Sequence, residues 1–308
     1  MTVALHIHDL RKQYSGTTAV AGLSFDVEAG SLCALLGANG AGKSTTIACI
    51  STLLGFDAGV IEVLGDRVGS GPAATARIRG RIGVVFQTSV LDPLLSVREN
   101  LTVRARLYRL DAASTDARIN ELAEMTDLSE FLDRRYGTLS GGQKRRADIA
   151  RALIHSPDIL ILDEPTAGLD PASRERIWDA IHTLRRATGM TVLLTTHYLA
   201  ETELADDVII IAGGALAERG SAAELRARLG ASRLSITPRP DAAALIAACA
   251  ALPGTREGDR FELRLPGSAV ALDLLAAHHT DILDFEFRHG TMDDVFLSVT
   301  GDTPKDPA

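Results

Sequence analysis

The sequence predicts an α/β fold with a mixed β-sheet core, an antiparallel β-layer, an inserted helical subdomain and a small C-terminal α/β domain. Three short apolar runs, at Leu32–Leu36, Ile159–Leu162 and Thr191–Thr195, are typical of buried parallel strands. The first thirty residues instead alternate apolar and polar positions, which indicates half-buried antiparallel strands. After Gly230 the composition shifts, and short strand-like and helix-like segments alternate. These patterns together indicate two domains.

The composition is that of an ordinary globular protein with enough apolar side chain for a core. Of the 308 residues, 46% are hydrophobic and 23% are charged, which argues against a disordered chain. The formal net charge of −8 gives no general attraction to nucleic acid, so we expect no nucleic-acid partner. Cys33, Cys49 and Cys249 are far apart and form no CxxC pattern, so neither a disulfide framework nor a zinc site is predicted, which fits the cytosol.

Contact with a membrane is expected only through a partner protein. The N-terminus lacks the basic segment and apolar segment of a secretory signal. The most apolar stretches are Ile159–Leu162, Val208–Ala217 and Ala242–Leu252, and each is shorter than the roughly 18–20 residues that a membrane-spanning helix needs. We therefore expect no direct insertion into the bilayer.

Changes of pattern along the chain give the expected domain limits. Residues 1–230 are expected to form the first domain, with the helical subdomain at about 88–140, where apolar residues recur every three to four positions. Residues 231–300 are expected to form an accessory α/β domain. Residues 301–308 contain two prolines and no apolar periodicity, which predicts a loose tail.

The segments of the accessory domain are expected in the order βαββαβ. The expected strands are Arg233–Thr237, Gly254–Glu257, Phe261–Leu265 and Ile282–Phe287, and the expected helices are Asp241–Leu252 and Ser268–His278. This order is that of a ferredoxin-like fold, in which two helices cover one face of the sheet. A final helix at Met292–Val299 is expected to pack on the first domain. The accessory domain would steady the subunit or its dimer, or tune its activity.

A glycine-rich loop follows the apolar run at Leu32–Leu36. Residues 37–44 match the pattern GxxxxGK[ST] between a predicted strand and a predicted helix, which is the position of a phosphate-binding loop. The residues expected to bind nucleotide here are Gly37, Asn39, Gly40, Ala41, Gly42, Lys43, Ser44 and Thr45. Lys43 is expected to contact the β- and γ-phosphates and Ser44 to bind Mg²⁺. A glycine-rich turn that only caps a helix is the disfavoured alternative.

Two acidic residues, Asp163 and Glu164, follow the buried strand Ile159–Leu162. This position is the carboxyl edge of the sheet, where the ligands of open α/β folds bind. Because successive residues of a strand point in opposite directions, the two carboxylates are expected to have different roles. Asp163 is expected to hold Mg²⁺, and Glu164 to orient the attacking water as the catalytic base. Acids at strand ends are often only solvated, but the phosphate loop favours the catalytic interpretation.

Leu139 is followed by Ser140, Gly141, Gly142 and Gln143, and this stretch lies shortly before the two acids. In register with the phosphate loop and the acids, it resembles the signature loop of ABC ATPases. The resemblance covers roughly residues 2–225. It implies the P-loop NTPase fold of ABC ATPases, which bind ATP and Mg²⁺. It also implies that Ser140, Gly141, Gly142 and Gln143 contact the nucleotide.

The resemblance assigns three further nucleotide-binding residues. Tyr14 resembles the aromatic residue that stacks on adenine, and Gln87 resembles the glutamine that senses Mg²⁺ and is a third metal contact. Asp170 belongs to the D-loop. Gly168 departs from the alanine of many relatives, which implies a more flexible D-loop here.

His197 resembles the switch histidine, which contacts the γ-phosphate and acts in catalysis together with Glu164 and Lys43. In ABC ATPases two copies pair head to tail. The resemblance therefore implies a homodimer in which Ser140 and the glycines after it close on a phosphate held by Lys43 of the other copy.

The resemblance extends to the ATPases that serve ABC-2 type export permeases, including the daunorubicin-resistance kind. The similar stretches are Arg145–Leu153, Thr195–Leu199 and Asp293–Gly301. We therefore expect a protein on the cytoplasmic face of the cell membrane that energises export through a separate permease chain. An importer ATPase is the alternative. A soluble non-transport ABC ATPase is less favoured, because the sequence contains one phosphate loop and no sustained heptads.

Lys144, Arg145 and Arg146 directly follow the signature. Three cations on the first turns of a helix are typical of a solvated helix face. We therefore expect these side chains to be exposed and not to form a nucleic-acid patch.

Overall fold

The computed structural model describes residues 2–230, 232–265 and 267–301, and they divide into two compact units. The first unit runs up to Tyr198 and includes Ala205–Ala217. The second comprises Leu199–Leu204 and the described chain from Glu218 onwards. The expected tail, 301–308, lies outside the described residues except for Gly301. No helix within the described residues is long and apolar enough to span a membrane.

An antiparallel sheet begins the first unit, as the alternating pattern predicts. Its strands are β1 (Val3–Tyr14), β2 (Thr17–Glu28), β4 (Ala58–Val63) and β5 (Asp66–Arg67), in the order β2-β1-β4-β5. Ile7 of β1 pairs with Phe25 on one side and with Ile61 on the other, and all three side chains are buried. The apolar face of this layer therefore belongs to the core of the unit.

A six-stranded sheet contains the three apolar runs. Its strands are β3 (Leu32–Gly37), β6 (Ile82–Val85), β7 (Ile159–Asp163), β8 (Thr191–Thr196), β9 (Asp207–Ala212) and β10 (Ala215–Gly220), in the order β10-β9-β3-β8-β7-β6. The pairs from β9 to β6 are all parallel. Every residue of β3, β7 and β8 is buried, because both faces of the sheet are covered. The carboxyl ends of these strands therefore meet at one edge.

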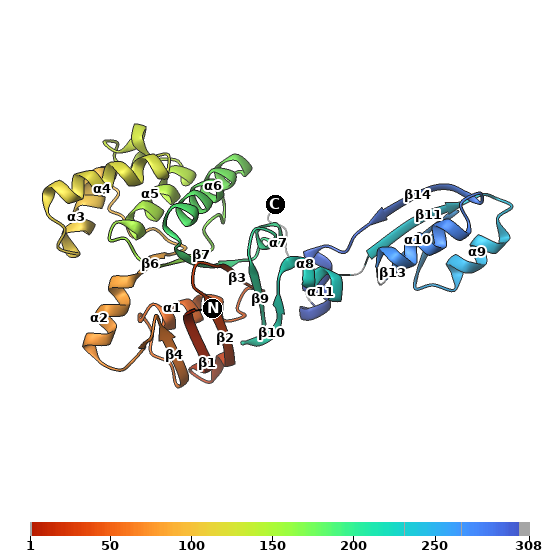
Figure 1. Cartoon of the computed structure of the whole chain (residues 1–308), viewed down its shortest axis with the longest axis horizontal. Coiled ribbons are helices and arrows are strands. Elements are labelled where there is room, and N and C mark those ends of the chain that lie inside the picture. Colours follow the sequence, from red (N-terminus) through yellow and green to blue (C-terminus); the bar gives the residue numbers. More distant parts are fainter. Residues whose placement is uncertain (1, 231, 266, 302–308) are drawn as a thin grey trace. The chain divides into compact units, whose positions relative to one another are not determined.

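Helices of the first unit are α1 (Lys43–Ile50), α2 (Pro72–Arg81), α3 (Val97–Leu107), α4 (Ala112–Met125), α5 (Gly141–Leu153) and α6 (Pro171–Thr188). Short 3₁₀ helices η1 (Ser129–Phe131) and η2 (Tyr136–Thr138) precede α5. Helices α3, α4 and α5 lie together at one end of the unit, opposite β1, β2 and β4 (Figure 1). Helices α3 and α4 fall within the range 88–140 that is expected for the helical subdomain, whereas α5 lies beyond it. Capping boxes at Ser96 and Ser140 begin α3 and α5.

The second unit contains a cluster of three helices, α7 (Leu199–Thr202), α8 (Ala222–Leu229) and α11 (Met292–Thr300). Helix α11 packs against α7 and α8 and buries Val295 and Phe296. Gly230 and Gly290 approach so closely that a Cβ at Gly290 would lie 2.5 Å from the carbonyl carbon of Gly230. The chain thus leaves this helix cluster and returns to it at nearly the same point.

A separate sheet and two helices lie between these two glycines. They are β11 (Ser232–Pro238), α9 (Ala243–Ala250), β12 (Gly254–Glu257), β13 (Arg260–Leu265), α10 (Ser268–Ala277) and β14 (Ile282–Arg288). The strand order is β12-β13-β11-β14, and all pairs are antiparallel. Leu234 packs in one cluster with Leu245 of α9 and Ala271 of α10, so both helices cover the same face (Figure 1). This is the predicted ferredoxin-like topology.

The grouping by contacts places Glu218–Gly230 in the second unit, whereas the sequence interpretation places these residues in the first domain. The expected domain limits at residues 230 and 300 therefore stay a prediction.

Candidate functional site

The phosphate loop connects β3 to α1 and depends on its glycines. Gly40 and Gly42 have φ angles of 83° and 103°, which lie in the region that favours glycine. A Cβ on Gly42 would lie 2.4 Å from the carbonyl oxygen of Ala19, and a Cβ on Gly37 would lie 2.7 Å from that of Ile211. Around Gly40, by contrast, nothing lies within 4 Å of a built Cβ. The loop is packed on its inner side and open on its outer side.

Lys43, the first residue of α1, is only 5% exposed. Its Nζ donates hydrogen bonds to the carbonyl oxygens of Gly37 at 2.7 Å and Ala38 at 3.1 Å. Burial lowers the pKa of Lys43, and the nearby Glu164 and Asp163 carboxylates oppose that shift. The ammonium group is therefore held inside the curl of the loop.

Asp163, at the end of β7, lies where two hydroxyl groups converge. Ser44 Oγ donates to Asp163 Oδ1 at 3.2 Å, and Thr195 Oγ1 donates to the same oxygen at 2.6 Å. Thr195 is a residue that the sequence interpretation did not assign to the site. A threonine near the end of the neighbouring buried strand is the signal that could have identified it, because parallel strands align their ends.

Glu164 adopts a φ of 47°, which is uncommon for a residue other than glycine. Its N–H donates to Thr195 Oγ1 at 3.0 Å and to the Thr195 carbonyl at 3.2 Å. Gln87 Nε2 donates to Glu164 Oε2 at 3.2 Å. His197 Nδ1 lies 3.3 Å from Glu164 Oε1, but the two atoms do not have hydrogen-bond geometry. One carboxylate is thus flanked by the predicted Gln87 and His197.

The signature residues begin helix α5. Ser140 is its N-cap: Gln143 N–H donates to Ser140 Oγ at 3.3 Å, and Ser140 N–H donates to Gln143 Oε1 at 3.0 Å. Ser140 and Gly141 are exposed, whereas Gly142 is buried. A Cβ on Gly142 would lie 2.6 Å from Ser173 Oγ and 2.8 Å from Ser173 Cβ. Gly142 is therefore required by packing within this chain.

The D-loop leads into helix α6. Asp170 is the N-cap of this helix, and it accepts a hydrogen bond from Ser173 N–H at 2.9 Å. Hydrogen bonds from the side chain and backbone of Ser173 lower the pKa of Asp170. Gly168 has a φ of 72°, and nothing lies within 4 Å of a built Cβ there. The glycine thus adopts a conformation that an alanine would adopt only with strain.

The remaining predicted residues surround the phosphate loop or lie on β1. Tyr14 is 45% exposed at the end of β1, with Lys12 Nζ 5.6 Å from its ring centroid. Asn39 is exposed on the outer turn of the loop, Ala41 is buried, and Thr45 is half-buried on the first turn of α1. Tyr14 therefore has a ring available for stacking.

The expectation of a solvated face at Lys144, Arg145 and Arg146 is wrong for the two arginines. Arg145 is 8% exposed and Arg146 is 6% exposed. Arg145 donates to the carbonyl oxygen of Phe86 at 2.6 Å, and Arg146 donates to that of Asp127 at 2.6 Å. A guanidinium can be buried where its donors meet carbonyl oxygens, and no local sequence pattern distinguishes this case from a solvated arginine.

The oxygen atoms of Ser44 and Asp163 fit one side of a Mg²⁺ site. Magnesium binds hard oxygen ligands and is usually held by one or two carboxylates together with substrate phosphates and water. Within the described residues there is no cluster of three His, Cys, Asp or Glu side chains that could hold a metal alone. The two protein oxygens match the small number of protein ligands that such a magnesium site has.

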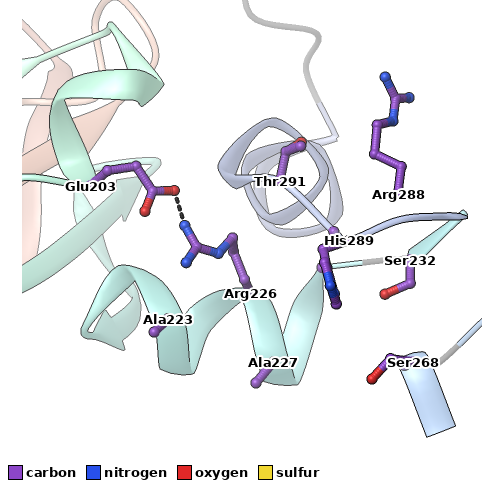
Figure 2. A pocket seen from close by; sticks show the side chains of 12 residues that line it. Glu203, Ala223, Arg226, Ala227, Ser232, Ser268, Arg288, His289 and Thr291 are labelled. Atoms are coloured by element: carbon purple, nitrogen blue, oxygen red, sulfur yellow. Dashed lines mark hydrogen bonds and ion pairs between the residues drawn. The ribbon is translucent and has the colours of Figure 1, made fainter.

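A hollow of about 630 Å³ lies in the second unit (Figure 2). Arg226 and Glu203 point toward one another across part of it and form an ion pair, while Arg288, His289 and Ser268 also line it (Figure 2). None of the predicted site residues lines this hollow.

Comparison with known proteins gives a consistent result. Residues 20–167 match the family described as ABC transporter. The daunorubicin/doxorubicin resistance ATP-binding protein of Streptomyces peucetius is 39% identical over 97% of this chain and 93% of its own. The linearmycin resistance ATP-binding protein of Bacillus subtilis is 37% identical over 98% and 100%. The Nod factor export ATP-binding protein I of Burkholderia orbicola is 41% identical over 80% of each chain.

Solved structures agree with the sequence comparison. An ATP-binding cassette described as dimeric, in a post-hydrolysis state with bound ADP and phosphate, matches with a TM-score of 0.66 and 27% identity. That match covers 70% of this chain and 98% of the cassette. A subunit of an ABC transporter complex from Clostridium perfringens matches with a TM-score of 0.69 and 28% identity, over 82% of this chain and 97% of its own.

Proposed function

Because this chain belongs to the ABC transporter family of ATP-binding proteins and hydrolyses ATP, we propose that its hydrolysis drives export through a separate ABC-2 type permease. Relatives that are named for drug resistance and for Nod factor export support this direction of transport. The substrate would be of the drug, lipid or polysaccharide type. The chain would act on the cytoplasmic face of the cell membrane.

The observation that carries the catalytic part of the proposal is the environment of Glu164. Its carboxylate lies between the Gln87 amide and the His197 ring. Its charge also opposes the lowering of the Lys43 pKa by burial. A carboxylate in this position can accept a proton from a water that attacks the γ-phosphate. His197 would contact the γ-phosphate, and Lys43 would neutralise charge on the β- and γ-phosphates.

Ser44, Asp163 and Gln87 would hold Mg²⁺. When bound, the ion would neutralise charge on the β- and γ-phosphate oxygens. The Ser44 and Asp163 oxygens are already 3.2 Å apart, so the chain prearranges two of these ligands. Thr195 donates to the same carboxylate oxygen at 2.6 Å and helps to fix its orientation. Tyr14 would stack on the adenine ring.

A second copy of the chain would complete the site. Ser140 is exposed at the N-terminus of a 13-residue helix, where unpaired backbone N–H groups and the helix dipole favour an anion. The proposed ligand is the γ-phosphate bound by the other copy. A dimeric relative with ADP and phosphate supports pairing of this kind.

The exposed apolar residues after Gln87 form the proposed permease-docking surface. Val90 is 60% exposed and Leu94 is 74% exposed, and Val103 and Leu107 of α3 are 52% and 70% exposed. Val103 and Leu107 are four positions apart and therefore share one helix face. A contiguous patch of such side chains would mark a surface that a partner covers, whereas a single exposed apolar residue such as Leu53 is ordinary.

The docking proposal can be tested by co-purification from detergent-solubilised membranes of the native host, with Leu94→Asp as the disrupting variant. Leu53→Asp is the matched control, because Leu53 is 60% exposed but lies outside the docking surface. We expect wild type and Leu53→Asp to retain a polytopic protein of about six spans, and Leu94→Asp to lose it. Equal retention by all three would contradict the docking surface. A partner encoded beside a solute-binding protein would favour import instead.

A further inference from the structure

Strand β6 is the last strand of the six-stranded sheet, and no other strand of the described residues pairs with its outer edge. Side chains of α5 and of the turn after it bind carbonyl groups along this edge. From one end to the other, the contacts join His155 to Ile82, Arg151 to Val84 and Arg145 to Phe86. A buried carbonyl without a partner costs free energy, so these three contacts fix α5 along the edge strand.

Arg145 reaches beyond the strand. Its Nη1 donates to the Phe86 carbonyl at 2.6 Å, and its Nη2 lies 3.1 Å from the Gln87 carbonyl and 3.4 Å from the Glu164 carbonyl. A guanidinium can bind several acceptors at once because its donors form a rigid planar fork. One side chain therefore contacts the backbones of Gln87 and Glu164, whose own side chains are hydrogen-bonded at 3.2 Å.

Asp148, one turn further along α5, holds the same segment from a second point. Its carboxylate accepts hydrogen bonds from Ser89 Oγ at 2.7 Å and from the Tyr136 hydroxyl at 3.3 Å. Burial raises the pKa of Asp148, and the hydrogen bond from Ser89 and the nearby guanidinium groups oppose that shift. Two side chains of α5, the cationic Arg145 and the acidic Asp148, thus bind the segment from Phe86 to Ser89.

We propose that Arg145 is a positioning residue for ATP hydrolysis. It holds the backbones of Gln87 and Glu164 at a fixed separation and ties both to the helix that begins at Ser140. This inference rests on the proposed role of Glu164 as the residue that orients water. A misplacement of a catalytic group by about 1 Å can lower the rate about a hundredfold. The phosphate loop around Lys43 is held by contacts of its own, so ATP binding does not depend on Arg145. Loss of Arg145 should therefore lower kcat and leave KM for ATP nearly unchanged.

The test compares Arg145→Met with Arg146→Met in the full-length chain. The two arginines are neighbours on α5 and are 8% and 6% exposed, but Arg146 binds Asp127 after α4 and does not contact Gln87 or Glu164. Steady-state phosphate release gives kcat and KM, and a thermal melt gives the stability of each variant. We expect Arg145→Met to lose at least about tenfold in kcat with KM within about twofold of wild type. Arg146→Met should lose stability only.

Arg145→Lys is the second variant, in case Arg145→Met does not fold. Lysine keeps the positive charge but is a point donor that cannot span three carbonyl groups. We expect a folded protein whose kcat lies at least about fivefold below wild type. Wild-type kcat in Arg145→Lys, or equal kcat losses in Arg145→Met and Arg146→Met at equal folded fraction, would overturn the proposal.

Glu164→Gln separates this inference from the function on which it rests. If Glu164→Gln keeps wild-type turnover, the proposed role of Glu164 is wrong. If Glu164→Gln is inactive while Arg145→Met keeps wild-type kcat, only the role of Arg145 is wrong.

Discussion

Glu164 combines an uncommon backbone conformation with a crowded carboxylate. Residues with a positive φ persist where the surroundings impose the conformation, and they are frequent at active sites. Here Thr195 imposes this conformation, because its hydroxyl oxygen and its carbonyl oxygen both accept hydrogen bonds from the Glu164 N–H. The side chain is then directed to Gln87 and His197. The pairing of strained backbone and flanked carboxylate favours a catalytic role over a solvated strand end.

Replacement of Glu164 by Gln should keep ATP binding and lower kcat by about a hundredfold or more, because the amide cannot accept the proton from water. ATP binding and phosphate release are measured on the same preparation. Lys43→Ala is the contrasting variant, since Lys43 contributes to phosphate affinity, and it should lose binding as well as turnover. Wild-type turnover in Glu164→Gln would remove Glu164 from catalysis.

Helices α5 and α6 meet at their N-termini with no room for a side chain at Gly142. The close neighbour is Ser173, which also donates to the N-cap Asp170. The signature and the D-loop are therefore packed on one another within a single chain.

Gly142→Ala should lower ATPase activity and thermal stability, because a methyl group would overlap Ser173. Ser173→Gly removes the overlapping atoms and should restore activity at least partly in the double variant. Ser173→Gly alone is the control, because it loses about 1 kcal/mol for a glycine in a helix and also loses the side-chain hydrogen bond to Asp170. If the double variant is no better than Gly142→Ala, the overlap is not the reason for the glycine.

His155 connects the end of α5 to β6 and should make stability depend on pH. Burial lowers the pKa of His155 to about 4, below its ordinary value of 6.5. The folded state therefore keeps the ring neutral while the unfolded state binds a proton as the pH falls below about 6.5. The stability that His155 contributes is thus present above pH 6.5 and is lost between about 6.5 and 4.

Urea denaturation at pH 7.5 and 5.5 measures this effect. We expect His155→Gln, which keeps a donor for the Ile82 carbonyl, to lose less stability between the two pH values than wild type. The exposed His279 provides the control variant, His279→Gln, which should behave as wild type. An unchanged pH dependence in His155→Gln would show that other groups cause it.

Across the whole molecule, the features that can be predicted from the sequence are those that depend on short stretches of residues. The apolar runs at β3, β7 and β8 and the motif at residues 37–44 are local, so the parallel sheet and the phosphate loop follow from them. The ferredoxin-like strand order also follows, from the sequence of strands and helices. The sequence also predicts that the final helix packs on residues before 230, but it does not predict α8 as the partner. The burial of Arg145 is not predicted either, because both features depend on contacts between residues far apart in the chain.

The ferredoxin-like segment is inserted between Gly230 and Gly290, which lie in contact. Deletion of residues 231–289 with direct joining of these glycines should retain α11 and the packing of Val295 and Phe296 on α8. Truncation after residue 230 removes α11, which packs against α8 and α7. We expect both proteins to bind ATP and the internal deletion to melt at a higher temperature. A lower melting temperature for the internal deletion would contradict the insertion.

In the proposed dimer, the signature residues of one copy close over the ATP that the other copy binds. Sedimentation velocity of Glu164→Gln with and without MgATP tests this arrangement most directly, because this variant should bind ATP without consuming it. We predict a monomer without nucleotide, a dimer with MgATP, and no dimer when Ser140→Arg is added to Glu164→Gln. A Glu164→Gln protein that binds ATP but sediments as a monomer at high concentration would contradict the account.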